Sequence, residues 1–101
     1  MGLYSEIKEA REQSKATKRE HLYKLAVEAV KNGTYKFTYG YNSDEALQEI
    51  EEVIDEMNEE LEEDGLTLDI SSTSNTRINV YNKNEFLGTF NFTLTIAIEA
   101  A

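Results

Sequence analysis

The sequence contains no cysteine, no proline and no tryptophan. Without cysteine the chain has no disulfide framework, no thiolate metal site and no cysteine nucleophile. No apolar run approaches the roughly 18–20 residues of a membrane-spanning helix, and residues 1–13 lack the apolar core of a secretory signal. We therefore expect a cytoplasmic protein, and the absence of proline favours a structure rich in regular helices and strands.

Basic residues are also scarce. The chain has 10 Lys and Arg against 20 Asp and Glu, which gives a formal net charge of −10. This excess of acid argues against direct binding to DNA or RNA phosphates, which requires clustered Lys and Arg. Hydrophobic residues nevertheless make up 40% of the 101 residues, enough for one core. The sequence predicts a single domain over residues 1–101.

The charges are strongly segregated along the chain. Residues 1–36 carry eight basic and five acidic groups, whereas residues 37–65 carry twelve acidic groups and no basic one. Residues 66–101 are close to neutral, with two basic and three acidic groups. A basic first third therefore precedes an intensely acidic middle segment, and this asymmetry is informative in its own right.

Residues 17–31 are predicted to form a helix. Thr17 and Glu20 have the capping-box spacing, in which each side chain satisfies a free backbone N–H. Gly33 accepts the left-handed conformation that ends helices. Residues 3–16 either extend this helix or form a separate solvent-exposed arm. The apolar stripe of the helix comprises Leu22, Leu25, Ala26, Ala29 and Val30.

A second helix is predicted over residues 43–64. Asn42 or Ser43 caps its start, and Gly65 ends it. Its apolar residues recur at spacings of three and four, which places them on one face. This stripe covers only about two heptads, so packing against a sheet is favoured over pairing with another helix. The stripe comprises Leu47, Ile50, Ile54, Met57 and Leu61.

Four segments show the two-residue alternation of strands: 34–41, 66–71, 77–81 and 86–98. The first carries the aromatic face Tyr35, Phe37, Tyr39 and Tyr41, which we expect in the core. The last is a single long strand with one apolar and one polar face. The order α-β-α-β-β-β predicts a two-layer α+β fold, with the helices on one face of a four-stranded, mainly antiparallel sheet.

The sequence offers little for catalysis or cofactor binding. His21 is the only histidine, and the five glycines are isolated, so no phosphate-binding loop can form. Asp55, Glu59, Glu62 and Glu63 could offer oxygens to a cation, but carboxylates along one helix diverge and no calcium-loop pattern is present. We expect no enzyme activity, no cofactor and no dedicated metal site.

The acidic helix is destabilised by repulsion between its own carboxylates. Seven pairs of carboxylates stand four residues apart within residues 45–64. At roughly 0.2–0.5 kcal/mol for each pair, the repulsion amounts to about 1.5–3.5 kcal/mol. Its twelve charges extend over roughly 30 Å, or about one charge per 2.5 Å. Duplex DNA carries one charge per roughly 1.7 Å of axis, or 3.4 Å on each strand, so the helix has a similar linear charge density.

In its small size, its acidity and the crowding of carboxylates at 43–64, the chain resembles the small inhibitors that phages and other mobile elements make against host nucleases. These include anti-CRISPR and anti-restriction DNA mimics. The resemblance implies a non-enzymatic protein that blocks the cationic groove of a nucleic-acid-binding defence protein, without contacting nucleic acid or membrane itself. The expected partner-binding residues are Asp55, Glu56, Glu59, Glu60, Glu62 and Glu63.

A second hypothesis assigns the charges to assembly. The basic residues of the first helix, among them Lys15, Lys18 and Arg19, would lie beside the acidic helix and neutralise it, within one chain or across a dimer. The protein would then be a small structural subunit that forms homo-oligomers through the two helices. Individual exposed ion pairs contribute little to stability.

Overall fold

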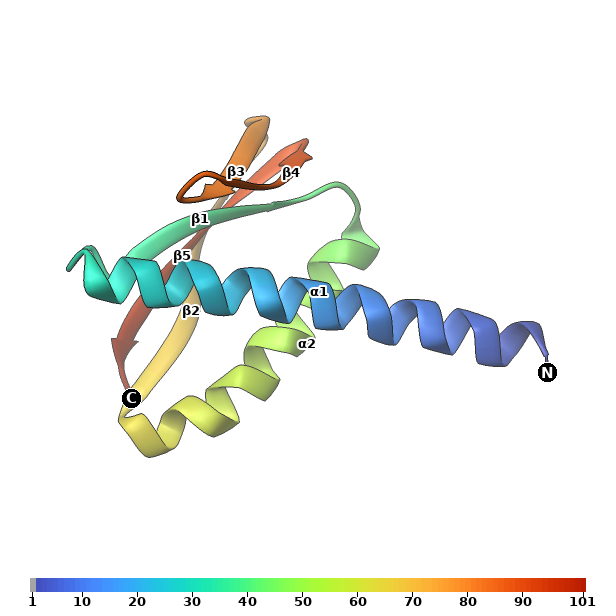
Figure 1. Ribbon diagram of the computed structural model, residues 1–101, viewed down its shortest axis with the longest axis horizontal. Coiled ribbons are helices and arrows are strands. Elements are labelled where there is room, and N and C mark those ends of the chain that lie inside the picture. The colour runs from blue at the N-terminus through green and yellow to red at the C-terminus, as the bar shows by residue number, and fades with distance from the viewer. Residues whose placement is uncertain (1) are drawn as a thin grey trace.

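The computed structural model describes residues 2–101 and has an α+β fold. Figure 1 shows two helices that cross in front of a three-stranded sheet, with a separate hairpin at one end. The elements in chain order are α1 (Leu3–Lys31), β1 (Lys36–Tyr41), α2 (Asp44–Leu61), the 3-10 turn η1 (Glu62–Asp64), β2 (Leu66–Ser74), β3 (Ile78–Asn82), β4 (Glu85–Phe90) and β5 (Phe92–Ala100).

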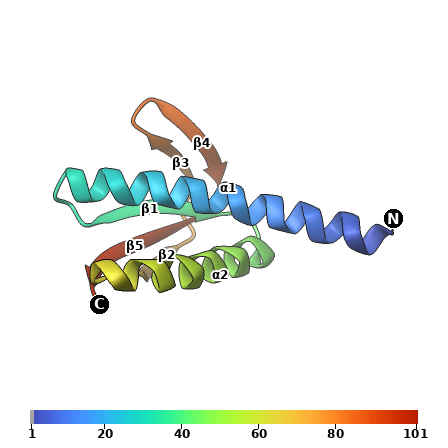
Figure 2. The same ribbon diagram turned by 60° about the horizontal axis from the view of Figure 1, so that its bottom comes forward.

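The main sheet has the strand order β1-β5-β2, and β5 pairs antiparallel with both neighbours. Strands β3 and β4 form a two-stranded antiparallel sheet of their own. Figure 2 shows this hairpin projecting away from α2, on the side of α1. The predicted α+β class is confirmed. The single four-stranded sheet and the order α-β-α-β-β-β are wrong, because residues 2–101 form five strands that divide into sheets of three and two.

The division arises where the expected long strand 86–98 is interrupted. Its apolar alternation continues through Phe90 and Phe92, but Asn91 between them is not part of a strand. The backbone N–H of Asn91 donates instead to the side-chain oxygen of Asn42, at 2.7 Å. The chain thereby leaves the hairpin as β4 and enters the main sheet as β5. Alternation alone cannot reveal this break, because the side-chain period is the same on both sides.

Helix α1 is one continuous helix of 29 residues, so residues 3–16 extend the predicted helix 17–31. The capping-box pair Thr17 and Glu20 lies inside the helix, where backbone N–H groups already have helical partners. The end is as expected, because Gly33 has φ +72° and the N–H of Thr34 donates to Ala29.

Helix α2 also matches its prediction closely. The hydroxyl of Ser43 accepts a hydrogen bond from the N–H of Ala46 at 3.1 Å, which makes Ser43 the N-cap. After Leu61 the chain continues as η1, and Gly65 ends the segment with φ +73°.

One hydrophobic cluster takes residues from both helices and from strands of both sheets. Its fully buried side chains are Leu22 of α1, Ile50 and Val53 of α2, and Leu94 and Ile96 of β5. The apolar stripe of α2 therefore packs on the sheet, as the sequence indicated. In the described residues 2–101, neither helix is both long enough and apolar enough to cross a membrane.

The aromatic strand is only partly in the core. Tyr39 is buried and Phe37 and Tyr41 are half-buried, but Tyr35 is 48% exposed. Tyr35 precedes β1 and has φ +53°, so it does not share the face that alternation assigned to it. Within β1, Gly40 is required by packing, because a Cβ there would lie 2.3 Å from Cβ of Phe90.

Candidate functional site

Helix α2 presents carboxylates on both sides of its apolar stripe. Four of them, Glu45, Glu49, Glu52 and Glu56, follow one another at spacings of four, three and four residues, so they share one flank of the helix. This paired flank faces α1. The basic residues of α1 that reach it also recur at helical spacing, between Arg11 and Arg19.

The two flanks make a ladder of ion pairs within the chain. The basic helix therefore lies beside the acidic one and neutralises one side of it without a second copy. The pairs are Arg11–Glu45 at 3.5 Å, Lys15–Glu52 at 3.7 Å, Lys15–Glu56 at 2.7 Å, Lys18–Glu49 at 3.0 Å, and Arg19–Glu56.

Glu49 is the one charged residue that is buried among the described residues. Ser14 donates a hydrogen bond to its carboxylate at 2.7 Å, and Lys18 donates another at 3.0 Å. Burial acts to raise the pKa of Glu49, but these two hydrogen bonds and the nearby positive charges outweigh it and leave the pKa below its ordinary value. Glu49 therefore stays ionised and ties α2 to α1.

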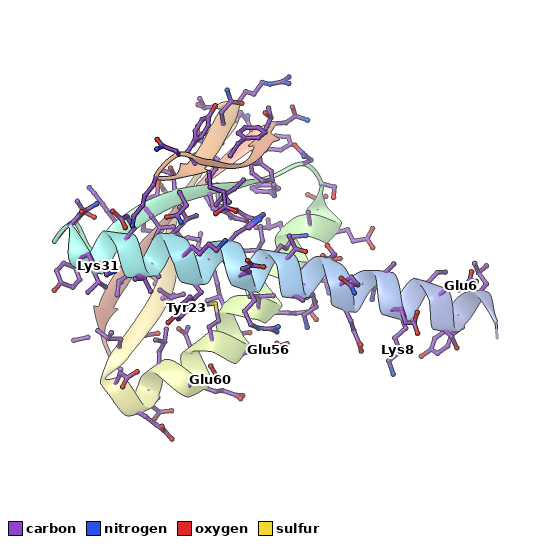
Figure 3. The ribbon with its side chains drawn as sticks, in the orientation of Figure 1. Glu6, Lys8, Tyr23, Lys31, Glu56 and Glu60 are labelled. Carbon is purple, nitrogen blue, oxygen red and sulfur yellow. The ribbon has the colours of Figure 1, made fainter. Side chains whose placement is uncertain are left out.

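Glu56, one of the expected partner-binding residues, belongs to this ladder. Its hydrogen bond from Lys15 lowers the pKa of the carboxyl group, and Arg19 adds to the effect. The same contact raises the pKa of Lys15. Figure 3 shows Glu56 on the part of α2 that α1 crosses, with Glu60 farther along the helix. Any partner that contacts Glu56 must compete with two cations of this chain.

The other five expected residues are exposed and have no ion-pair partner within residues 2–101. The same holds for Glu51 and Asp64. We call these carboxylates the open acidic surface: Glu51, Asp55, Glu59, Glu60, Glu62, Glu63 and Asp64. It runs from Glu51 of α2 to the end of η1. The last turn of α2 and all of η1 contain no basic residue.

Two further carboxylates adjoin this surface. A shallow cleft of about 530 Å³ between α2 and the β2 edge is lined by Glu51 and Asp55 and also by Asp69 and Glu99. Among the residues that the structure describes, no Lys or Arg lines this cleft. The sequence reasoning missed Asp69 and Glu99 because they lie in strand segments far from the acidic helix. The sequence signal that could have found Asp69 and Glu99 is their position among the polar, solvent-facing residues of two segments with the alternation of a strand.

The cleft carboxylates do not converge as a metal site. Among residues 2–101, no three or more His, Asp or Glu side chains are arranged to hold a metal ion. The open acidic surface is a spread of separate charges, and such a spread attracts a polycationic surface rather than a single ion.

His21 lies in a different place, between α1 and β1. Its Nδ1 is 2.9 Å from the hydroxyl of Tyr39, and the two rings meet edge to face with centroids 5.9 Å apart. Burial raises the pKa of Tyr39 to about 12, and burial lowers the pKa of His21. Near neutral pH a protonated tyrosine hydroxyl is therefore hydrogen-bonded to a neutral imidazole, and this contact joins the first helix to the sheet.

No protein-family model matches the chain, and neither a curated protein nor a solved structure matches it.

Proposed function

We propose that this protein is a non-enzymatic acidic inhibitor that occupies the cationic groove of a nucleic-acid-binding protein through its open acidic surface. The observation that carries the proposal is the unequal neutralisation of α2. Helix α1 supplies cations to the paired flank, whereas the seven carboxylates of the open acidic surface have no cationic partner within residues 2–101.

The unpaired carboxylates retain their mutual repulsion. Glu59 and Glu63 stand four residues apart, and Glu60 and Asp64 do the same, which destabilises a helix by roughly 0.2–0.5 kcal/mol per pair. They also lie at the negative end of the helix dipole, where cations are favoured. A partner that brings Lys and Arg to this end of α2 relieves both the repulsion between carboxylates and their unfavourable position at the dipole. Attraction between the opposite charges of the two proteins would also speed their association.

The setting that fits this chemistry is infection of a bacterium by a phage or mobile element, whose inhibitor protein blocks a defence nuclease of the host. In that setting a small acidic protein acts in the bacterial cytoplasm and competes with DNA for a cationic groove. Asp55, Glu59, Glu60, Glu62 and Glu63 are the contact residues we propose. Glu56 is secondary, because Lys15 and Arg19 already neutralise it.

Assembly through the two charged helices is the less favoured function. The ladder between α1 and α2 forms inside one chain, so it uses the basic residues that a homo-oligomer of that kind would need. A salt-sensitive oligomer in sedimentation equilibrium would restore this alternative.

The test compares two variants that lose the same charge. In E59Q/E62Q/E63Q the loss falls on the open acidic surface, and in the control E6Q/E9Q/E12Q it falls on exposed residues of α1 that make no ion pair within residues 2–101. Each immobilised protein is exposed to bacterial lysate at low and at high salt, and the captured proteins are identified by mass spectrometry. Captured DNA-binding proteins are then purified and tested for displacement of labelled duplex DNA.

The proposal expects the wild type and the α1 control to capture the same DNA-binding protein and to displace DNA from it. The surface variant should lose both activities, and high salt should weaken them. Equal capture by all three proteins, or capture without displacement of DNA, would contradict the proposal.

A further inference from the structure

An apolar groove lies beside the open acidic surface. Helices α1 and α2 are held together by the ion-pair ladder and then diverge toward their C-terminal ends, with the sheet behind the gap (Figure 1). A groove of about 300 Å³ occupies this region. Tyr23 and Val30 line it from α1, Met57 and Leu61 from α2, and Leu66 from β2.

The groove exposes apolar surface that the fold does not use. Tyr23 is 63% exposed and Val30 is 39% exposed, although the adjoining side of α1 packs into the core through Leu22. Figure 3 shows Tyr23 on the edge of α1 that faces the C-terminal half of α2. Contiguous exposed apolar side chains that include an aromatic residue are typical of protein-binding sites.

The α2 edge of the groove is negatively charged. Glu60 lies between Met57 and Leu61, both of which line the groove, and η1 adds three carboxylates directly after Leu61. None of these four acids has an ion-pair partner within residues 2–101. Within residues 2–101, the only charged residue that lines the groove is Lys31, at the C-terminal end of α1. An apolar occupant with cations along α2 is therefore complementary to the groove.

The conformation of the occupant follows from the lining. Apart from Lys31, every residue that lines the groove has an apolar or aromatic side chain. A segment inserted there finds almost no hydrogen-bond partner for its backbone, so it must satisfy its own N–H and C=O groups. An α-helix does so, whereas an extended strand does not.

A second copy of this chain is disfavoured as the occupant. Each copy has a formal net charge of −10, so two copies repel one another. The exposed apolar segment that could reach such a groove is the start of α1, with Leu3, Tyr4 and Ile7. The charges on residues 3–11 are two acidic and two basic, so this segment brings no net attraction to the acidic edge.

We propose that the groove binds an amphipathic helix of the target protein. Its apolar side chains lie between α1 and α2, and its Lys and Arg side chains lie along Glu60 and η1. The inference rests on the proposed function, since it takes the target to be cationic. It adds an apolar anchor to the electrostatic contact, so specificity comes from the groove and charge supplies attraction and orientation.

The test uses two synthetic peptides of equal charge as probes. One is an amphipathic helix of Leu and Lys, and the other has Ser in place of each Leu. Binding to the protein is measured by calorimetry, and the contacted residues are located by NMR chemical-shift changes. The groove variant is Y23Q/V30Q, and its matched control is Y4Q/I7Q, which alters similar exposed side chains elsewhere on α1. All four substitutions introduce a good helix former at an exposed position.

The proposal expects the Leu–Lys peptide to bind one to one and to shift the groove resonances. Y23Q/V30Q should weaken its binding about tenfold or more, while Y4Q/I7Q leaves it unchanged. The Ser–Lys peptide should bind weakly and equally to all three proteins. Equal binding of the Leu–Lys peptide to the wild type and Y23Q/V30Q would overturn the groove proposal.

The variant E59Q/E62Q/E63Q distinguishes failure of the groove proposal from failure of the proposed function. If E59Q/E62Q/E63Q loses cationic probes and the DNA-binding target while Y23Q/V30Q keeps both, the acidic surface acts alone and only the groove proposal fails. Self-association that disappears in Y23Q/V30Q would also overturn it, because the occupant would then be a second copy.

Discussion

The ammonium group of Lys18 lies 3.0 Å from Oε1 of Glu49, and the two side chains are only 16% and 10% exposed. Ser14 completes the contact by donating to the same oxygen. This pair differs from the rest of the ladder, in which at least one partner is well exposed to water. It is therefore the ion pair whose loss should matter most for stability, because shielded charges are costly to leave without a partner.

Replacement of Glu49 by Ala should destabilise the protein by about 1–3 kcal/mol, because Lys18 and Ser14 then lose a shielded acceptor. The measurement is urea unfolding followed by circular dichroism. Glu45 supplies the matched control, since its pair with Arg11 spans 3.5 Å and it is 71% exposed. E45A should change the free energy of unfolding by less than about 0.5 kcal/mol. Equal effects of the two substitutions would show that the shielding of Glu49 contributes nothing.

Stability should also depend on the protonation of His21. Burial, the largest influence, lowers the pKa of His21 below its ordinary 6.5, although Glu20 and Glu85 oppose the shift. As the pH falls through 6.5, the unfolded chain takes up the proton first, so the folded state loses stability. The stability that neutral His21 contributes is present above its ordinary pKa. It is lost as the pH falls toward the lower pKa that His21 has in the folded protein.

Urea unfolding of the wild type and H21Q from about pH 7.5 to about pH 5.5 tests this expectation. The wild type should lose stability relative to H21Q, which cannot titrate there. His21 is the only histidine, so the difference between the two proteins isolates its titration. A difference that stays constant with pH would show that the pKa of His21 is the same in the folded and unfolded chain.

Asn58 should prove important for the edge of the main sheet. Its side chain accepts from the N–H of Leu68 at 2.8 Å and donates to the C=O of the same residue at 3.0 Å. Strand β2 is an edge strand, so these two groups have no strand partner on that side. We expect N58A to destabilise the protein by about 1–3 kcal/mol and to increase its aggregation, because an open strand edge invites pairing between chains.

Unfolding measurements and light scattering would detect these two effects. N82A serves as the control, because Asn82 is half-buried but its side-chain oxygen has no hydrogen-bond partner within the described residues. If N58A is as stable and as soluble as the wild type, water hydrogen-bonds the backbone N–H and C=O of Leu68 as well as Asn58 does.

Neutralisation of the open acidic surface should stabilise the isolated protein. E59Q/E62Q/E63Q removes the repulsion between Glu59 and Glu63 and three charges near the negative end of α2, so we expect a gain of about 0.5–1.5 kcal/mol. Added salt should stabilise the wild type more than the variant, because it screens the same repulsion. Thermal unfolding at two salt concentrations measures both effects, and a destabilised variant would contradict the argument.

Stabilisation combined with loss of partner binding would show that this surface is maintained for function at the expense of stability. That combination is common at binding sites, where groups are arranged for a partner rather than for the fold. E6Q/E9Q/E12Q provides the control for a simple change of net charge.

Several features of the fold could be predicted because their causes are local. The three-and-four spacing from Leu47 to Leu61 establishes a helix and its buried face, and Ser43 and Gly65 mark its limits through capping and a positive φ. The alternation in β2 and β5 reveals strands in the same way. The crowding of acids on α2 is likewise visible without coordinates, since i,i+4 neighbours on a helix are always adjacent.

The tertiary structure decided which of those acids remain unpaired. Glu56 and Glu60 are equivalent in the sequence pattern, but Glu56 meets Lys15, 41 residues earlier in the chain, whereas Glu60 lies beyond the crossing of the helices. The break at Asn91 and the role of Asn58 also depend on residues distant in sequence.

Local patterns specify the helices, most of the strands and the charge that each carries, because capping, periodicity and i,i+4 neighbours act within a few residues. The division into two sheets, the pairing of the flank of α2 that faces α1, and the apolar groove farther along between the same two helices arise only in the folded chain. These depend on the path by which α1 crosses α2 and on the contacts of Asn42 and Asn58. Such contacts join positions that no local pattern relates, so only the folded chain could reveal them.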